Sequence, residues 1–366
     1  MFQNPIDKSR VYYDLNISNI NTKTGDNPVL KFSQTYGSNI IDIPKNYYMS
    51  IIRFSLDTSS LPVLLPTIEP NQSDPNLTIY SVSMTYNNYV SQAFIKFVPQ
   101  DQTQNVPSPP SLNKNLYQSY VPYYYIYNYS YFITLVNTAL TTCFNNLQNQ
   151  VQLPTSNVPY LQWDNSTEKA TLITDNAGFN DANTNPISLY FNNALYQLFC
   201  SFPMYIYSTT SLQGLNYRIS CNAYGQALKQ TSGTYTLLLC EQEHTTINLW
   251  SPISSIVFTS NTLPINNELV SAPSVYLNSK SIQSTDNNII SQTVADFEAS
   301  DLTYKPYLAY QPSIFRYIDL KGNSELRNID ISCYWKNNIG DLTPFYLNSG
   351  DSASMKIMFC LKQTQN

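Results

Sequence analysis

Charged side chains are scarce in this chain of 366 residues. Asp, Glu, Lys and Arg together make up 12% of the sequence, where roughly 25% is usual for a soluble protein. The net charge of −5 provides no general positive field for nucleic-acid phosphates, so direct binding of nucleic acid is disfavoured. The solvated surface must instead be built from neutral polar groups, which 42 asparagines and 31 tyrosines supply as amides and phenols.

Glycine and histidine are also rare. None of the nine glycines falls in a spacing such as G-x-G-x-x-G or G-x-x-x-x-G-K, which cradles phosphate groups. His244 is the only histidine, so it alone would have to serve any catalytic dyad, triad or zinc site. We therefore expect no enzymatic activity, no catalytic residue, no cofactor and no bound metal.

Long apolar runs and closely spaced cysteine pairs are missing as well. No segment approaches the roughly 18 apolar residues that a membrane helix needs, and residues 1–7 lack the basic and apolar regions of a secretion signal. The six cysteines include no C-x-x-C pair, and several lie in apolar stretches such as 237–240 and 358–361. We expect no membrane span, and reduced thiols in a reducing compartment.

Alternation of apolar and polar residues is the strongest pattern that is present. Residues 11–18 alternate clearly, which predicts a strand with one buried face. Residues 47–56 predict another strand, in which Ile52, Phe54 and Leu56 are expected to share the buried face.

Strands continue through much of the chain. Residues 77–98 predict a hairpin that turns at Asn87-Asn88, because asparagine tolerates the positive φ of tight turns. Further strands are predicted at 204–208, 216–221, 234–240 and 246–259. The cleanest patterns lie near the C-terminus, where two sets of alternate residues are expected to be buried: Ile329, Ile331, Cys333 and Trp335, then Met355, Ile357, Phe359 and Leu361.

Helices form a minor part of the predicted structure. A 3.6-residue period predicts a helix over 130–147, capped by Ser130, and a shorter helix over 191–200 ends before Pro203. Residues 99–114 lack periodicity and predict a linker. Because most predicted strands have no helix between them, we predict an all-β sandwich or jelly roll with one or two helices. The length predicts two lobes.

Two segments carry groups that could bind a metal ion. Glu241, Glu243 and His244 lie within four residues, but on a strand His244 points away from the two carboxylates, so an exposed polar turn is favoured. Residues 175–181 (DNAGFND) offer oxygen ligands for calcium, yet they lack the alternating acidic spacing, so a plain turn is favoured.

Two other groups could make contacts with partners. An acidic cluster could pair with Arg316 or Lys321 in one chain or across a subunit contact, although a solvated loop is favoured; it comprises Asp296, Glu298 and Asp301. A tyrosine run could stack on sugars or bases, although burial at a protein interface is favoured; it comprises Tyr123, Tyr124, Tyr125, Tyr127 and Tyr129.

Several segments resemble the penton and minor capsid proteins of virophages and polinton-like viruses. They are 44–56 (PKNYYMSIIRFSL), the helix at 130–147 with Trp163-Asp164 after it, 249–258 (LWSPISSIVF) and the run from Tyr334 to Phe359. The resemblance spans most of the chain, and its motifs are structural rather than catalytic. It implies a jelly roll that forms the five-fold vertex of a capsid as a homopentamer, with an inserted, mostly β domain facing outward.

The resemblance also sets expectations for domains and partners. Residues 1–100 would hold the first strands of the jelly roll, 101–240 a helix-containing region that could include the insertion, and 241–366 the remaining strands. Expected partners are further copies of the chain, a neighbouring major capsid protein and, in addition, a host receptor or glycan. The expected location is the virion, after assembly in the host cytoplasm. Alternatives are a trimeric capsid protein with two jelly rolls and a β-sandwich that binds carbohydrate or a receptor.

Overall fold

The chain leaves its first folding unit after Leu61 and returns to it at Ile253 in the computed structural model. Residues 1–61 and 253–366 form unit 1, and residues 62–252 form unit 2. Unit 2 is therefore an insertion between two strands of unit 1, whereas the sequence analysis placed its region limits after residues 100 and 240. The structure describes residues 9–20, 27–68, 76–107, 121–222, 227–232, 235–266, 268–269, 274–277, 280–283, 290–298, 306–338 and 340–362.

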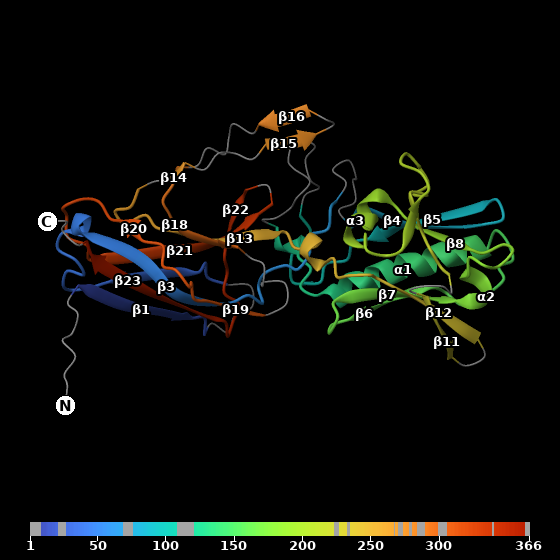
Figure 1. Ribbon diagram of the computed structural model, residues 1–366, viewed down its shortest axis with the longest axis horizontal. Coiled ribbons are helices and arrows are strands. Elements are labelled where there is room, and N and C mark those ends of the chain that lie inside the picture. The colour runs from blue at the N-terminus through green and yellow to red at the C-terminus, as the bar shows by residue number, and fades with distance from the viewer. Residues whose placement is uncertain are drawn as a thin grey trace. The chain divides into compact units, whose positions relative to one another are not determined.

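Unit 1 contains two main antiparallel sheets. One has the strand order β1-β23-β3-β19, with β20 also pairing with β3, and the other has the order β18-β13-β21-β2, with β22 pairing with β21 (Figure 1). Two small two-stranded sheets, β14-β17 and β15-β16, complete the described strands. The elements are β1 Arg10–Ser18, β2 Lys31–Thr35, the 3-10 turn η1 Pro44–Asn46, β3 Tyr47–Asp57, β13 Ile253–Thr259, β14 Glu268–Leu269, β15 Ser274–Leu277, β16 Lys280–Gln283, β17 Ile290–Ser291, β18 Thr293–Glu298, β19 Tyr307–Tyr310, β20 Ile318–Asp319, β21 Asn328–Asn337, β22 Leu342–Pro344 and β23 Ser352–Leu361.

The two main sheets of unit 1 bury their facing side chains against each other. Phe54 of β3 lies 5.0 Å, ring centroid to ring centroid, from Phe258 of β13 in the opposite sheet. On β21, the four predicted residues Ile329, Ile331, Cys333 and Trp335 are all buried. This packing of two antiparallel sheets confirms the predicted all-β jelly-roll class.

The predicted buried face of β3 is correct only in part. Phe54 and Leu56 are buried, but Ile52 is half-exposed, and Met49 and Ile51 are buried in its place. Arg53 pairs with Lys356 and Ile51 with Ile357, which leaves Ile52 without an opposite residue on β23. This β-bulge shifts the alternation by one residue, so inward positions are odd before it and even after it.

The predicted face of β23 also differs at its end. Met355, Ile357 and Phe359 are buried as expected, whereas Leu361 is 42% exposed and Met358, on the opposite face, is 1% exposed. Leu361 is the last residue of the strand. Met358 pairs with Tyr12 and Ser50 on the two flanking strands.

Unit 2 is built around one long helix. Helix α1 contacts β4 and β5 of one sheet and β6 of another (Figure 1). The sheets have the strand orders β5-β4-β8-β10-β9 and β11-β12-β7-β6. The elements are β4 Leu77–Tyr86, β5 Tyr89–Lys96, the 3-10 turn η2 Pro122–Tyr124, α1 Tyr129–Gln148, β6 Tyr160–Asp164, β7 Lys169–Asp175, α2 Asn176–Phe179, β8 Ser188–Phe191, α3 Asn193–Leu198, β9 Met204–Ile206, β10 Tyr217–Ile219, β11 Ala227–Ser232, β12 Tyr235–Glu241 and the 3-10 turn η3 Ile247–Leu249.

The predicted hairpin and helices of unit 2 are present, with changes at their ends. Asn87 has φ of +49° between β4 and β5, as the turn prediction requires. The cap of α1 is Asn128 rather than Ser130, because the Asn128 side chain accepts a hydrogen bond from the Tyr131 N–H at 2.8 Å. No helix among the described residues is long and apolar enough to cross a membrane.

Candidate functional site

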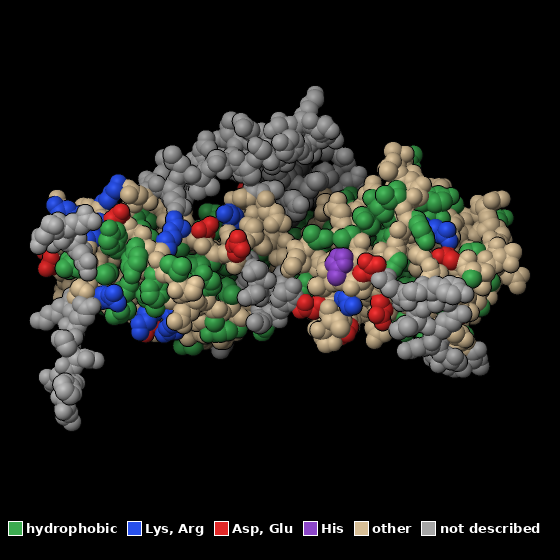
Figure 2. All heavy atoms as spheres, in the orientation of Figure 1, with side chains coloured by type: hydrophobic (Ala, Val, Ile, Leu, Met, Phe, Trp, Pro, Cys, Tyr) green, Lys and Arg blue, Asp and Glu red, His purple; other side chains and the backbone are tan. Residues whose placement is uncertain are grey.

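The predicted metal or acid–base segment at Glu241–His244 forms a turn that a buried glutamine holds in place. The Gln242 Oε1 accepts a hydrogen bond from the Ala170 N–H at 2.7 Å, and its Nε2 donates to Ser201 Oγ at 3.0 Å and Thr246 Oγ1 at 3.2 Å. The His244 side chain is exposed, as the purple atoms of Figure 2 show. The amide of Gln242, and not the imidazole, therefore organises this segment.

The two carboxylates of the predicted calcium loop, Asp175 and Asp181, accept hydrogen bonds from other residues of unit 2. Asp175 caps helix α2 through the Ala177 N–H at 3.0 Å and also accepts hydrogen bonds from Thr155 and Asn157. Burial acts to raise the pKa of Asp175, but these three hydrogen bonds outweigh it and leave the pKa below its usual value. Asp181, at the other end of the loop, is engaged with different residues. No group of three or more His, Cys, Asp or Glu side chains suited to a metal ion occurs in the described part of the chain.

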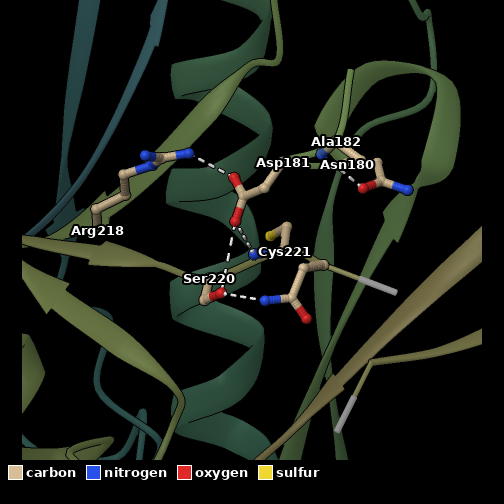
Figure 3. Close-up of polar contacts among 7 residues, drawn as sticks. Asn180, Asp181, Ala182, Arg218, Ser220 and Cys221 are labelled. Carbon is tan, nitrogen blue, oxygen red and sulfur yellow. Dashed lines mark hydrogen bonds and ion pairs between the residues drawn. The ribbon is translucent and has the colours of Figure 1, made fainter. Parts of the chain in front are cut away.

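Asp181 is the centre of a polar network that joins the loop after α2 to β10 (Figure 3). Its carboxylate bonds to Arg218 Nη2 at 2.5 Å and accepts the Cys221 N–H at 3.0 Å. The Asp181 N–H donates to the Cys221 carbonyl at 2.6 Å. A hydrogen bond with Cys240, together with burial, raises the pKa of the Cys221 thiol well above its usual value. The network thus holds the backbone at Asp181 against the backbone at Cys221, and the Asp181 carboxylate neutralises the charge of Arg218. The raised pKa keeps the Cys221 thiol protonated.

The acidic cluster lies on a strand, so the favoured solvated loop is wrong for its described residues. Asp296 and Glu298 belong to β18 and are exposed, and Asp301 lies outside the described residues. The Asp296 Oδ1 is 3.6 Å from Nη1 of Arg316. The pairing with Arg316 that the sequence suggested therefore occurs within one chain.

The tyrosine run packs inside unit 2, so its predicted burial at a protein interface is wrong for three of the five side chains. Tyr123, Tyr124 and Tyr125 are at most 7% exposed in the single chain. The Tyr123 and Tyr124 ring centroids are 5.1 Å apart, and both rings contact Phe97. Burial raises the pKa of Tyr124 to about 12. These phenols therefore form part of the core of unit 2.

An exposed aromatic face on unit 2 was not predicted from the sequence. Register places Phe94, Tyr190, Arg218 and Tyr205 on the face of the β5-β4-β8-β10-β9 sheet that is turned away from α1. Phe94 is 53% and Tyr205 is 58% exposed. Two cations lie on this face: Arg218, which is paired with Asp181, and Lys96, which is exposed two residues after Phe94 on β5. Alternation in the strand predicted at 204–208 could have placed Tyr205 and Tyr207 together.

Unit 2 as a whole carries little charge. It holds 14 of the 43 charged residues although it is the larger unit, and helix α1 contains none. Four threonines of α1 donate their hydroxyls to the backbone carbonyl four residues earlier: Thr134, Thr138, Thr141 and Thr142. The surface of this unit is therefore suited to contacts that are neutral, aromatic and rich in hydroxyls and amides.

The family model and the individual relatives that match this chain point to the same family. The model of the family described as Sputnik minor capsid protein V18/19 matches residues 11–361. The uncharacterized protein V18 of Sputnik virophage is 38% identical over 144 residues, which cover 38% of this chain and 86% of V18. Structural protein V19 of Sputnik virophage is 27% identical over 215 residues, which cover 55% of this chain and 93% of V19.

Solved structures resemble the chain over almost its full length. A chain in the electron cryo-microscopy structure of the Sputnik virophage superposes with a TM-score of 0.81 at 27% identity, covering 97% of this chain and 98% of that chain. The mavirus penton protein superposes with a TM-score of 0.61 at 15% identity, covering 97% of this chain and all of that chain. The latter likeness is one of fold.

Proposed function

Because the chain belongs to the Sputnik minor capsid protein V18/19 family, we propose that five copies of it form each five-fold vertex of a virophage capsid. It is a structural protein of the virion. Its copies would meet around the vertex as a homopentamer, and the neighbouring major capsid protein would surround them. Assembly would take place in the cytoplasm of the host cell.

The family match over residues 11–361 carries this proposal, because it includes both the jelly roll and the insertion. The mavirus penton protein shares the fold over its whole length, which supports a vertex position in particular. A five-fold ring needs two different surfaces on each copy, since its contacts join unlike patches and close by rotation. A surface with few charges favours such packing, because many like copies then repel each other weakly.

The trimeric capsid protein with two jelly rolls is not favoured. In unit 2, α1 contacts strands of both sheets, whereas in unit 1 phenylalanines of the two sheets meet directly. A second jelly roll would repeat the plan of unit 1. The lectin alternative is not favoured either, and contact with a host receptor or glycan stays a prediction.

The structural role of the family implies that the protein is not an enzyme. The site geometry supports this. The carboxylates of Asp175 and Asp181 are engaged in separate hydrogen-bond networks, and the thiol of Cys221 is buried with a raised pKa. A nucleophile would need an exposed, activated group beside a base.

The experiment that tests the proposal is a measurement of mass in solution by light scattering, with negative-stain images of the same peak. A mass about five times 41.7 kDa and rings with five-fold symmetry are expected. Trimers would instead support the double jelly-roll assignment. A chain that stays monomeric at high protein concentration and after mixing with its major capsid protein would contradict the pentamer.

A further inference from the structure

A cavity of about 510 Å³ opens on unit 2 where helix α1 ends. It is lined by Gln148, the last residue of α1, and by the segment that leads from α1 to β6. Residues 148–158 contain no charged side chain. The volume falls within the range of roughly 300–1,000 Å³ that is usual for small-molecule sites. The cavity therefore has the size of a ligand site and walls that carry no net charge.

Hydrogen bonds hold the walls of the cavity in place. The N–H groups of Gln150 and Val151 donate to the Leu147 carbonyl at 3.0 Å and 3.1 Å, which turns the chain sharply after α1. Further along the segment, the Thr155 hydroxyl donates to the carboxylate of Asp175, which also caps α2. A backbone that is held in this way loses little conformational freedom when a ligand binds.

Several polar side chains of the cavity have no hydrogen-bond partner elsewhere in the described part of the chain. They are the amides of Gln148, Asn149 and Gln152 and the hydroxyl of Ser156. An amide donates through its nitrogen and accepts through its oxygen, so neighbouring amides match the adjacent hydroxyls of a sugar ring. Val151 and Leu153 are half-buried among them and add apolar surface.

We propose that the cavity at the end of α1 binds an uncharged saccharide, whose hydroxyls bond to the free amides and whose C–H groups pack on Val151 and Leu153. The binding chemistry needs one chain alone. Its use in attachment to glycans of a host surface rests on the proposed function, because a protein of the virion is carried to that surface.

Electrostatics select a neutral sugar over an acidic one. The C-terminal end of a helix carries a partial negative charge, and the last turn of α1 has no basic residue to offset it. The carboxylate of a sialic acid or a sulfate ester would lose water in this cavity without gaining a counter-charge from its walls. Neutral glycans should therefore bind more tightly than their sialylated or sulfated forms.

The test exposes the purified full chain to a glycan array that carries neutral, sialylated and sulfated oligosaccharides. We expect the chain to bind neutral oligosaccharides. Calorimetry with the free form of the best-bound oligosaccharide should then give one sugar per chain. Binding of acidic glycans alone, or of no glycan, would overturn the proposal.

Variants place the binding in the cavity. Gln148→Ala and Gln152→Ala should each weaken it by about fivefold or more, because each removes an amide that bonds to the sugar. Ser156→Trp should abolish it by filling the cavity. Gln162→Ala is the matched control, since this exposed amide lies on β6 and does not line the cavity. Thermal unfolding verifies that each variant is folded. Binding that no cavity variant weakens would overturn the site.

Light scattering on the same samples separates this inference from the proposed function. All residues that line the cavity belong to unit 2 of one chain, so monomers and pentamers should bind the sugar alike. Sugar binding by a chain that forms no pentamers would refute the vertex assignment alone. Pentamers that bind no sugar would refute the saccharide site alone.

Discussion

The rings of Tyr196 and Tyr217 lie parallel, with centroids 3.6 Å apart and planes inclined by 2°. Tyr196 is on helix α3 and Tyr217 is on β10, which pairs with β8 at Phe191. The helix is thereby fixed to the second strand that follows it in the chain. Both rings are half-exposed, so stacking and burial of ring faces contribute together.

Replacing Tyr217 should show how much this stack stabilises unit 2. We expect Tyr217→Ala to lower the free energy of unfolding by about 1–3 kcal/mol, because ring burial and the stacked contact are both lost. Tyr217→Phe keeps the ring and should stay close to wild type. Urea unfolding of both variants, and of each combined with Tyr196→Ala, isolates the pair, and equal effects in the presence and absence of Tyr196 would refute a direct contribution of the stack.

Both the backbone conformation at position 214 and the side chains around it require a glycine there. Its φ is +68°, and an added Cβ would lie 2.8–2.9 Å from Gln92 Nε2, Ser81 Oγ and Ser83 Oγ. Gly322 has φ of +85° with open space around it. We expect Gly214→Ala to destabilise by at least about 1 kcal/mol more than Gly322→Ala, measured by urea unfolding, because only the former adds a clash to the strained backbone. Equal losses would contradict the close approach.

The start of α1 can be tested with two neighbouring residues. Asn128→Ala should cost about 1 kcal/mol, because it removes the acceptor for the Tyr131 N–H. Ser130→Ala should be near neutral, since Ser130 lies inside the first turn, where alanine is a better helix former. Thermal unfolding of the two variants ranks them, and a larger loss for Ser130→Ala would place the cap where the sequence pattern alone suggested.

The pH dependence of stability should carry the signature of Asp175. Hydrogen bonds lower the pKa of its carboxyl in the folded protein, in spite of partial burial. A carboxyl with a depressed folded pKa stabilises the fold above its unfolded pKa, and this contribution is lost as the pH falls through the folded pKa. Asp175→Asn should therefore flatten the loss of stability between about pH 5 and about pH 2.

Glu168 supplies the opposite control. Burial raises the pKa of its carboxyl, so its contribution is present at low pH and is lost as the pH rises through the folded pKa. Glu168→Gln should consequently make the acid-side loss of stability steeper. The measurement is the free energy of unfolding from urea titrations at several pH values. A change of the same sign in both variants would contradict this assignment.

The His244 side chain is exposed, whereas the buried Gln242 side chain holds its segment in place. Replacing each residue should therefore have a different effect. His244→Ala should change the free energy of unfolding by less than about 0.5 kcal/mol and leave the oligomeric mass unchanged. Gln242→Ala should cost about 1–3 kcal/mol, because it leaves the buried Ala170 N–H without its acceptor. Calorimetry and light scattering check both. Collapse of the fold or of the oligomer in His244→Ala would overturn the surface position of the imidazole.

Local patterns predicted much of this fold where one face of a strand meets the core. On β21, inward residues alternate without interruption, so the sequence pattern and the burial agree at all four positions. On β3, the bulge at Ile52 reverses the parity, and its cause lies in the register with β23, a strand some three hundred residues away in sequence. Periodicity within one segment does not contain that information.

Long-range packing also decides features that local sequence patterns do not contain. The tyrosines at 123–125 are rich in hydroxyls, which suggested an interface, yet Phe97 and the rest of unit 2 enclose them. The chain passes from unit 1 to unit 2 after Leu61 and back after Pro252. Both points lie in apolar, proline-containing sequence that resembles many other places in a chain with 22 prolines. The Asp181 network joins a loop to a strand with 36 residues between Asp181 and Arg218, and neither segment has a motif of its own.

Strand β23 lies between β1 and β3, and it is the ladder partner that joins them. A ribosome synthesises β1 and β3 first, then the whole of unit 2, and residues 352–361 only after more than three hundred others. Unit 2 is continuous in sequence and can therefore fold during synthesis. Until β23 has been made, the edges of β1 and β3 that pair with it stay unpaired. A chain without residues 352–361 would leave those edges open, so the first sheet of unit 1 closes only after β23 has been made.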